Sequence, residues 1–242
     1  MSEHILCSID DGVATLTLNR PDKLNALTAA LFHELDAHLD AIEAHDVACV
    51  LLTGAGRSFC AGHDLDDVAN VEDTMRFENG VIERLASLPV PVIAAVRGHC
   101  LTGGLELALA AEIIIASDSA KFADTHAKWD LVPVWGLSQR LPRRVGTARA
   151  KEMMYASRTY NADAACKMGL ANFVVPDADL DAEARRFCND IKSNSRRAVR
   201  ALKKLVDQTE DMRLSEGIAW ELHHTEGVGP ELQERLDRMR KK

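Results

Sequence analysis

The stretch VPVIAAVRGHCLTGGLE, residues 90–106, decides the fold of this chain. Its apolar part, residues 90–96, lies between Pro89 and Gly98 and has the length of a strand that is buried on both faces. A glycine-containing turn follows, and a short helix opens after Gly104. The stretch therefore predicts a strand–turn–helix unit.

Similar units occur on both sides of it. Residues 47–52 form another continuous apolar run, closed by glycines and followed by a turn at residues 58–65, and residues 113–116 form a third run. Residues 13–18 alternate between apolar and polar side chains, and a helix with apolar positions at helical spacing is expected from Thr28, its N-cap. Strands that alternate with helices predict an α/β fold with parallel strands and crossover helices.

The pattern changes after about residue 140, where helical segments replace the alternation and only residues 172–175 favour a strand. The last fifty or so residues are expected to form a helical subdomain. The sequence thus divides into a core, residues 1–189, and a C-terminal helical part, residues 190–242.

Composition limits the function. The 242 residues are 47% hydrophobic and 27% charged, as in ordinary globular proteins, and the formal charge of −8 disfavours a nucleic-acid partner. The six cysteines form no CxxC pair, which is typical of buried thiols in a reducing compartment. No apolar run reaches 18 residues and no secretory leader is evident, so we expect a cytoplasmic protein without a membrane partner.

Three familiar site motifs are incomplete. The GAGRSF stretch at residues 54–59 has Phe59 where a dinucleotide fingerprint needs its third glycine. Gly98 and Gly103 have the spacing of a phosphate-binding loop, but Gly104 and Leu105 replace the lysine and hydroxyl residue that should follow. The histidines of HELDAH, residues 33–38, are five positions apart and diverge on a helix, so no metal site is expected.

The strongest candidates for a catalytic site are the two turns that follow the buried strands, residues 58–65 and 98–106. If their strands are neighbours, backbone N–H groups from both turns can converge on one oxygen, as an oxyanion hole requires. Glu106 lies in the first turn of the helix and could act as a base in the same cleft. The alternative is that the glycines serve close packing and that Glu106 is only a helix-start acid favoured by the helix dipole.

Five segments resemble the crotonase superfamily, the enoyl-CoA hydratase/isomerase family, in order and spacing. They are NRP with NAL at residues 19–27, FCAGHDL at 59–65, the turn through GGLEL at 98–107, Phe122, and Gly136 with QRL at 139–141. The resemblance covers about residues 5–240. It implies a spiral of ββα units with a C-terminal helical trimerisation subdomain, a homotrimer or homohexamer, and an acyl-CoA thioester substrate. Coenzyme A enters as part of that substrate, and no separate cofactor is implied.

The resemblance also implies roles for particular residues. The backbone N–H groups of His63 and Gly103 would form the oxyanion hole, and Glu106 aligns with the first of the two catalytic glutamates of the hydratases. The side chain of His63 is expected to be a polar group near the pocket rim. The residues that match the family's coenzyme A pocket are Lys23, Leu24, Ala26, Ala61, Asp64 and Leu65.

One position departs from the family. The second catalytic glutamate, four residues after Phe122, is replaced by His126. A histidine can donate or accept a proton near neutral pH, so His126 is predicted as the acid/base partner or orienter of Glu106. Asp124 or Asp130 could supply a carboxylate, but both lie away from the aligned position, so each is interpreted as a loop or capping acid. Trp129 and Trp135 flank the segment where the family's acyl tail lies, and the bulk around Trp135 indicates a shaped or shortened acyl pocket.

The predicted function is an enoyl-CoA hydratase, a lyase that adds water across the 2,3 double bond of a 2-enoyl-CoA through a stabilised enolate. Other crotonase-fold reactions, such as double-bond isomerisation or decarboxylation, remain open because the second glutamate is replaced. A non-catalytic acyl-CoA binding protein is the third possibility, and the retention of Glu106 argues against it.

Overall fold

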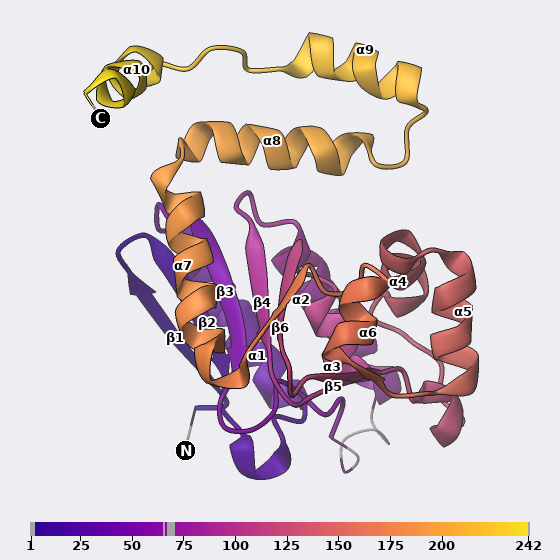
Figure 1. Ribbon diagram of the computed structural model, residues 1–242. Coiled ribbons are helices and arrows are strands. Elements are labelled where there is room, and N and C mark those ends of the chain that lie inside the picture. The colour runs from indigo at the N-terminus through magenta and orange to yellow at the C-terminus, as the bar shows by residue number, and fades with distance from the viewer. Residues whose placement is uncertain (1–2, 65, 67–70, 242) are drawn as a thin grey trace.

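The computed structural model describes residues 3–64, 66 and 71–241, and its main feature is a six-stranded sheet (Figure 1). The strand order is β1-β2-β3-β4-β6-β9; β1 and β2 are antiparallel, and the other neighbours are parallel. The strands are β1 (Ile5–Asp10), β2 (Val13–Leu18), β3 (Cys49–Gly54), β4 (Val92–Val96), β6 (Ile113–Ser117) and β9 (Phe173–Val175). This confirms the predicted α/β fold.

Two details of the sheet differ from the prediction. Strand β1, which the sequence analysis did not predict, pairs with β2 along its whole length. Strand β3 begins two residues later than the apolar run at Val47, because its parallel pairing with β2 starts where Val13 lies opposite Cys49. The strand predicted around residues 90–96 is present as β4, and all five of its residues are buried.

A smaller sheet brings the turns together. It consists of β5 (His99–Leu101), β7 (Lys121–Ala123) and β8 (Tyr160–Asn161), and β5 and β7 are parallel. Isolated bridges join Cys60 to Cys100 and Leu27 to His63 in the same parallel sense. Segments that follow successive strands of the large sheet are therefore aligned in a second layer, and this layer positions the site.

Helices cover both faces of the large sheet. Helix α1 (Ala29–Glu43) starts at the predicted N-cap, where Thr28 Oγ1 accepts the N–H of Leu31 at 3.2 Å. Its apolar side joins α2 (Val71–Ala86) and α3 (Gly103–Ala108) in the main core. On the opposite face, α7 (Leu180–Ser193) packs on alternate residues of the central strands, such as Leu51 and Ile93.

The remaining helices lie beside or beyond this core. They are η1 (Pro21–Lys23), η3 (His126–Trp129), α4 (Leu137–Val145), α5 (Thr147–Ala156), α6 (Ala162–Lys167), η4 (Asp177–Asp179), α8 (Arg196–Thr209), α9 (Leu214–His224) and α10 (Leu232–Arg240). Helices α8 to α10 extend away from the sheets, as the orange and yellow ribbons of Figure 1 show, and none of their residues is buried.

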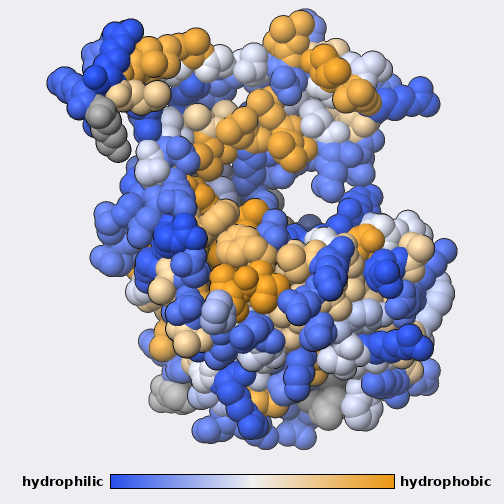
Figure 2. Space-filling view, in the orientation of Figure 1, coloured by the Kyte–Doolittle hydropathy of each residue, from blue (hydrophilic) through white to orange (hydrophobic). Residues whose placement is uncertain are grey.

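Apolar side chains of these C-terminal helices face solvent. Figure 2 shows hydrophobic atoms exposed on the arm formed by α8 to α10. They include Leu202, Val206, Leu214, Ile218 and Leu222, each more than half exposed. Among the described residues, no helix is long and apolar enough to cross a membrane.

Candidate active site

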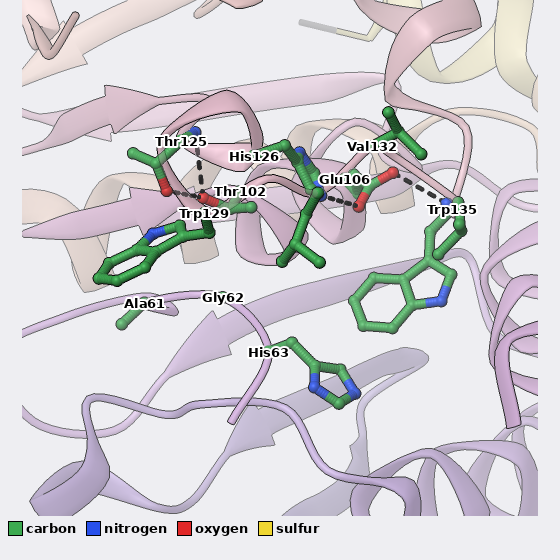
Figure 3. Close-up of a pocket in the computed structure, with 13 residues that line it drawn as sticks. Ala61, Gly62, His63, Thr102, Glu106, Thr125, His126, Trp129, Val132 and Trp135 are labelled. Carbon is green, nitrogen blue, oxygen red and sulfur yellow. Dashed lines mark hydrogen bonds and ion pairs between the residues drawn. The ribbon is translucent and has the colours of Figure 1, made fainter. Parts of the chain in front are cut away.

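A cavity of about 110 Å³ lies between the two glycine-containing turns and the segment that follows β7. Its walls come from residues 61–63, residues 102–106 and residues 125–135 (Figure 3). Glu106 and His126 face each other across the upper part of the view, while His63 and Trp135 lie below and beside them. The structure thus places the predicted catalytic side chains and the two predicted backbone donors around one cavity.

The two turns are held in contact by backbone hydrogen bonds. Cys60 N donates to His99 O at 2.8 Å, and Leu101 N donates to Cys60 O at 3.0 Å. A Cβ atom placed on Gly103 would lie 3.4 Å from the His63 nitrogen, so the two amides are close neighbours. Gly103 is also the first residue of α3, where an N–H has no partner within its own helix. This arrangement makes both amides suitable donors to one ligand oxygen.

The backbone before Gly103 adopts an uncommon conformation. Thr102 has φ +51°, and its hydroxyl lies 2.5 Å from that of Thr125 and accepts the N–H of Thr125 at 3.2 Å. Non-glycine residues with positive φ persist only where neighbouring contacts impose them, and such residues cluster at functional sites. The pair of threonines fixes the start of α3 relative to the segment that carries His126.

Glu106 is 1% exposed and is oriented by the backbone of the facing segment. Its Oε1 accepts the N–H groups of Trp135 at 2.9 Å and Leu137 at 3.2 Å, and Oε2 lies 3.6 Å from His126 Nε2. Burial raises the pKa of Glu106 above its usual value, although the nearby His126 and the two N–H donors oppose that change. One carboxylate oxygen is thus fixed by the backbone, and the other faces the histidine.

Asp124 holds the other side of the His126 ring. Its Oδ1 lies 2.6 Å from His126 Nδ1 and also accepts the backbone N–H of His126 at 3.1 Å. Asp124 is 1% exposed. The interpretation of Asp124 as a loop or capping acid was therefore incomplete, because the carboxylate also orients the imidazole. Asp130, in contrast, is exposed and has no side-chain contact to the site among the described residues.

His63 and Trp135 form the inner wall of the cavity. Their ring centroids are 5.2 Å apart, and the His63 side chain is only 11% exposed, so it lies inside the pocket and not at the rim as predicted. A Cβ on Gly103 would lie 2.5 Å from Trp135 Cζ3, which explains why this position needs glycine. Trp135 is 2% exposed, whereas Trp129 is 59% exposed, so only Trp135 restricts the inside of the cavity.

The residues predicted to contact coenzyme A come from two adjoining segments. Ala61 N donates to Leu24 O at 2.9 Å, and Leu27 N, next to Ala26, donates to Gly62 O at 2.8 Å. Lys23 is exposed at the end of η1. Leu65 lies outside the described residues.

An ion pair joins the same two segments. Arg20 Nη2 lies 2.9 Å from Asp64 Oδ2, and both side chains are largely buried. Burial is the largest single effect and would raise the pKa of Asp64, but the hydrogen bonds from Arg20 and the Asp66 backbone, together with the nearby positive charges, outweigh it. The pKa is therefore lowered, which favours the charged carboxylate. Arg20 was not among the predicted site residues; its position in the Asn-Arg-Pro turn is the sequence signal that pointed to it. No group of three potential metal ligands occurs in the described part of the chain.

Comparison with known proteins identifies the family. The sequence profile described as enoyl-CoA hydratase/isomerase matches residues 8–235. The chain belongs to this family. A crystal structure of enoyl-CoA hydratase from Bacillus anthracis superposes with a TM-score of 0.93 at 35% identity, covering 98% of this chain and 96% of the other. The resemblance inferred from the sequence and the crotonase fold are both confirmed.

Two relatives show the range of reactions in the enoyl-CoA hydratase/isomerase family. A short-chain-enoyl-CoA hydratase from Clostridium acetobutylicum is 36% identical over 90% of this chain and 86% of its own length. A 1,2-epoxyphenylacetyl-CoA isomerase from Escherichia coli is 38% identical over 87% of this chain and 84% of its own length. Overall similarity does not separate hydratase from isomerase chemistry, so the site itself must be used to choose between them.

Proposed function

We propose that this enoyl-CoA hydratase/isomerase family member is an enoyl-CoA hydratase. The observation that carries the proposal is the facing pair Glu106 Oε2 and His126 Nε2, 3.6 Å apart, with Asp124 behind the histidine. At this separation both atoms can hydrogen-bond the same water molecule. Hydration needs a water activated for attack at C3 and a proton for C2, and this arrangement supplies a base and an acid side by side.

In the proposed mechanism, the thioester oxygen accepts hydrogen bonds from the His63 and Gly103 amides. These donors stabilise the negative charge that develops on the oxygen as the enolate forms, and one such donor is worth about 10²- to 10³-fold in rate. Glu106 accepts the proton of the attacking water. His126, oriented by Asp124, delivers a proton to C2 and returns to its neutral form.

The coenzyme A part of the substrate would lie along the two segments joined by the Arg20–Asp64 ion pair. The residues proposed to line it are Lys23, Leu24, Ala26, Ala61 and Asp64, with Leu65 assigned from the resemblance alone. We also propose assembly into a trimer or hexamer, because association would cover the exposed apolar side chains of α8 and α9.

A hydration assay tests the function. Crotonyl-CoA is followed at the absorbance of its conjugated enoyl group with wild type, Glu106→Gln, His126→Ala and the exposed control Asp130→Asn. Wild type and control are expected to hydrate it, and the two site variants are expected to lose about 10²- to 10⁴-fold in kcat, the usual contribution of an acid or base. A wild type that binds the thioester without consuming the enoyl band would disprove the hydratase.

Double-bond isomerisation is the second candidate. It is favoured by the replacement of the second glutamate by His126, since one shuttling base suffices to move a proton between carbons. A 3-enoyl-CoA substrate distinguishes the two. Its conversion to the conjugated 2-enoyl thioester, without hydration of crotonyl-CoA, would identify an isomerase.

A further inference from the structure

A second set of buried polar atoms lies across the cavity from His126, and the mechanism above does not use it. Both carboxylate oxygens of Glu78, the His63 Nε2 and the Trp135 Nε1 are buried without a hydrogen-bond partner among the described residues. Glu78 itself is 0% exposed. Buried polar groups are almost always satisfied, and an unsatisfied one destabilises the protein, more so when it is charged. Four such atoms in contacting side chains indicate a missing hydrogen-bonding group.

These side chains gather around the His63 ring. Glu78 Oε1 lies 3.8 Å from His63 Nε2, which is beyond hydrogen-bond distance, and the indole of Trp135 lies against the same ring at a centroid distance of 5.2 Å. Phe32 packs edge-on against Trp135 at 5.0 Å and makes that side apolar. Of these described side chains, Glu78, His63 and Trp135 carry the polar atoms, and His63 and Trp135 line the cavity.

The cluster adjoins the reaction centre. His63 and Trp135 line the same cavity as Glu106 and His126, and in Figure 3 both rings lie on the side of the cavity opposite His126. The Trp135 ring also packs on Gly103, whose amide is a proposed oxyanion donor. With the thioester carbonyl carbon, C1, held at the proposed oxyanion donors, the acyl chain would contact this wall within a few bonds of C1.

The unpaired atoms limit which ligand group can pair with them. His63 Nδ1 lies 3.2 Å from Asp64 O, and since a carbonyl only accepts, Nδ1 carries the hydrogen of that bond. With the hydrogen on Nδ1 of a neutral ring, Nε2 is an acceptor; carboxylate oxygens also accept, and Trp135 Nε1 is a donor. A hydroxyl group both donates and accepts, whereas an alkyl tail does neither and an ammonium only donates.

We propose that His63, Glu78 and Trp135 form a subsite for a hydroxyl group carried by the acyl part of the substrate. The preferred substrates are then short hydroxyacyl-CoA thioesters, with the hydroxyl donating to His63 Nε2 or to the adjacent Glu78 carboxylate and accepting from Trp135 Nε1. This inference deepens the proposed function and rests on it for the acyl-CoA class. It also gives a role to the His63 side chain, beyond that of its backbone amide.

Equilibrium binding tests the subsite without requiring turnover. Isothermal titration calorimetry would compare butanoyl-CoA and pentanoyl-CoA with their analogues hydroxylated at C4 or C5, none of which can be hydrated. Wild type is expected to bind at least one hydroxylated ligand about 10- to 100-fold more tightly than its parent, the usual effect of a hydrogen bond to a charged group. Glu78→Gln should reduce that preference to a few-fold, and the exposed control Glu221→Gln should preserve it.

A second variant tests whether an effect of Glu78→Gln comes from misfolding. Trp135→Phe keeps an aromatic ring against Phe32 and removes the indole donor, so it should also lower the hydroxyl preference, measured as the ratio of the affinities for the hydroxylated ligand and its parent. Equal binding of parent and hydroxylated ligands by wild type would overturn the proposal and indicate that a buried water alone satisfies these groups. A hydroxyl preference that both variants retain would equally overturn it. If the preference is found but no enoyl-CoA is turned over, the subsite stands and the hydratase proposal fails.

Discussion

Replacing Asp124 by asparagine tests whether the carboxylate behind His126 contributes to the reaction. Asp124→Asn keeps the volume of the side chain and an oxygen that can still accept from His126 Nδ1, now 2.6 Å away, but removes the negative charge. Hydrogen bonds to a charged partner contribute about 1.5–3 kcal/mol, and neutral ones about 0.5–1.5 kcal/mol. The difference of about 1–2 kcal/mol, felt when His126 carries its proton, predicts a fall in kcat of about 5- to 30-fold.

The assay is steady-state hydration of crotonyl-CoA, with kcat and KM determined separately. KM is expected to change less than kcat, because Asp124 is buried behind His126 and acts through it. Asp130→Asn makes the same chemical change at an exposed position six residues away and serves as the control.

A double-mutant cycle with His126→Ala decides the mechanism of the effect. If Asp124 acts only by positioning and stabilising His126, the double variant should be no slower than His126→Ala alone. If the two losses multiply, the reasoning is refuted, and Asp124 acts on the substrate or on the fold independently of the histidine.

Three further variants test other parts of the site. Because burial raises the pKa of Glu106, the activity of wild type should be lost on acidification at a pH above 4.5, the ordinary glutamate value; a pH–rate profile that stays flat to that pH would contradict the role of Glu106 as base. The same raised pKa means that the folded state favours the protonated form of Glu106 and disfavours the ionised form. Protonated Glu106 therefore stabilises the fold below pH 4.5, and this contribution is lost as the pH rises through the folded pKa. Glu106→Gln, which stays neutral, should melt at an equal or higher temperature than wild type at pH 8, measured by circular dichroism. Gly103→Ala places a Cβ 2.5 Å from Trp135 Cζ3 and should destabilise the fold by about 1–3 kcal/mol in urea titrations, together with a loss of activity; a fully stable and active variant would show that Trp135 can move away. Lys23→Gln should raise KM for a CoA thioester several-fold at low salt and less at high salt, as expected for an exposed charge near a phosphate, and an unchanged KM at low salt would remove Lys23 from the binding site.

The parts of the fold that the sequence predicted share a strong local signal. Strand β4 is a continuous apolar run between a proline and a glycine, and α1 combines an N-cap at Thr28 with an apolar stripe, so neither depends on distant contacts for its recognition. Strand β1 was missed because it lies at the edge of the sheet, where only Ile5 is fully buried and the remaining residues are partly exposed. Pairing with β2 defines this strand, and pairing is not visible in a local pattern.

The turns after the buried strands indicated where a site could lie, but the roles of particular residues came from the family resemblance. The structure places His63, Gly103, Glu106 and His126 around one cavity, and their roles stay predictions. Asp124 was set aside because its contact with His126 depends on the turn between β7 and η3. Glu78 did leave a sequence signal, since Val81, Ile82 and Leu85 follow it at intervals of three, four and seven residues and mark the apolar face of α2. An acid on that face is the pattern that identifies a buried carboxylate.

The replacement of a glutamate by His126 preserves the number of mobile protons at the proposed centre. Two glutamates that share one proton carry a single negative charge, since two ionised carboxylates this close repel each other. Glu106, protonated His126 and Asp124 also carry one net negative charge and one transferable proton, and here the carboxylates are separated by an imidazole that lies 3.6 Å from one and 2.6 Å from the other. The histidine alone could not achieve this, because neutral His126 beside an ionised Glu106 would hold the charge but no proton for C2. In the proposed hydration, Asp124 Oδ1, 2.6 Å from His126 Nδ1, stabilises the ring at the step in which it carries the proton for C2.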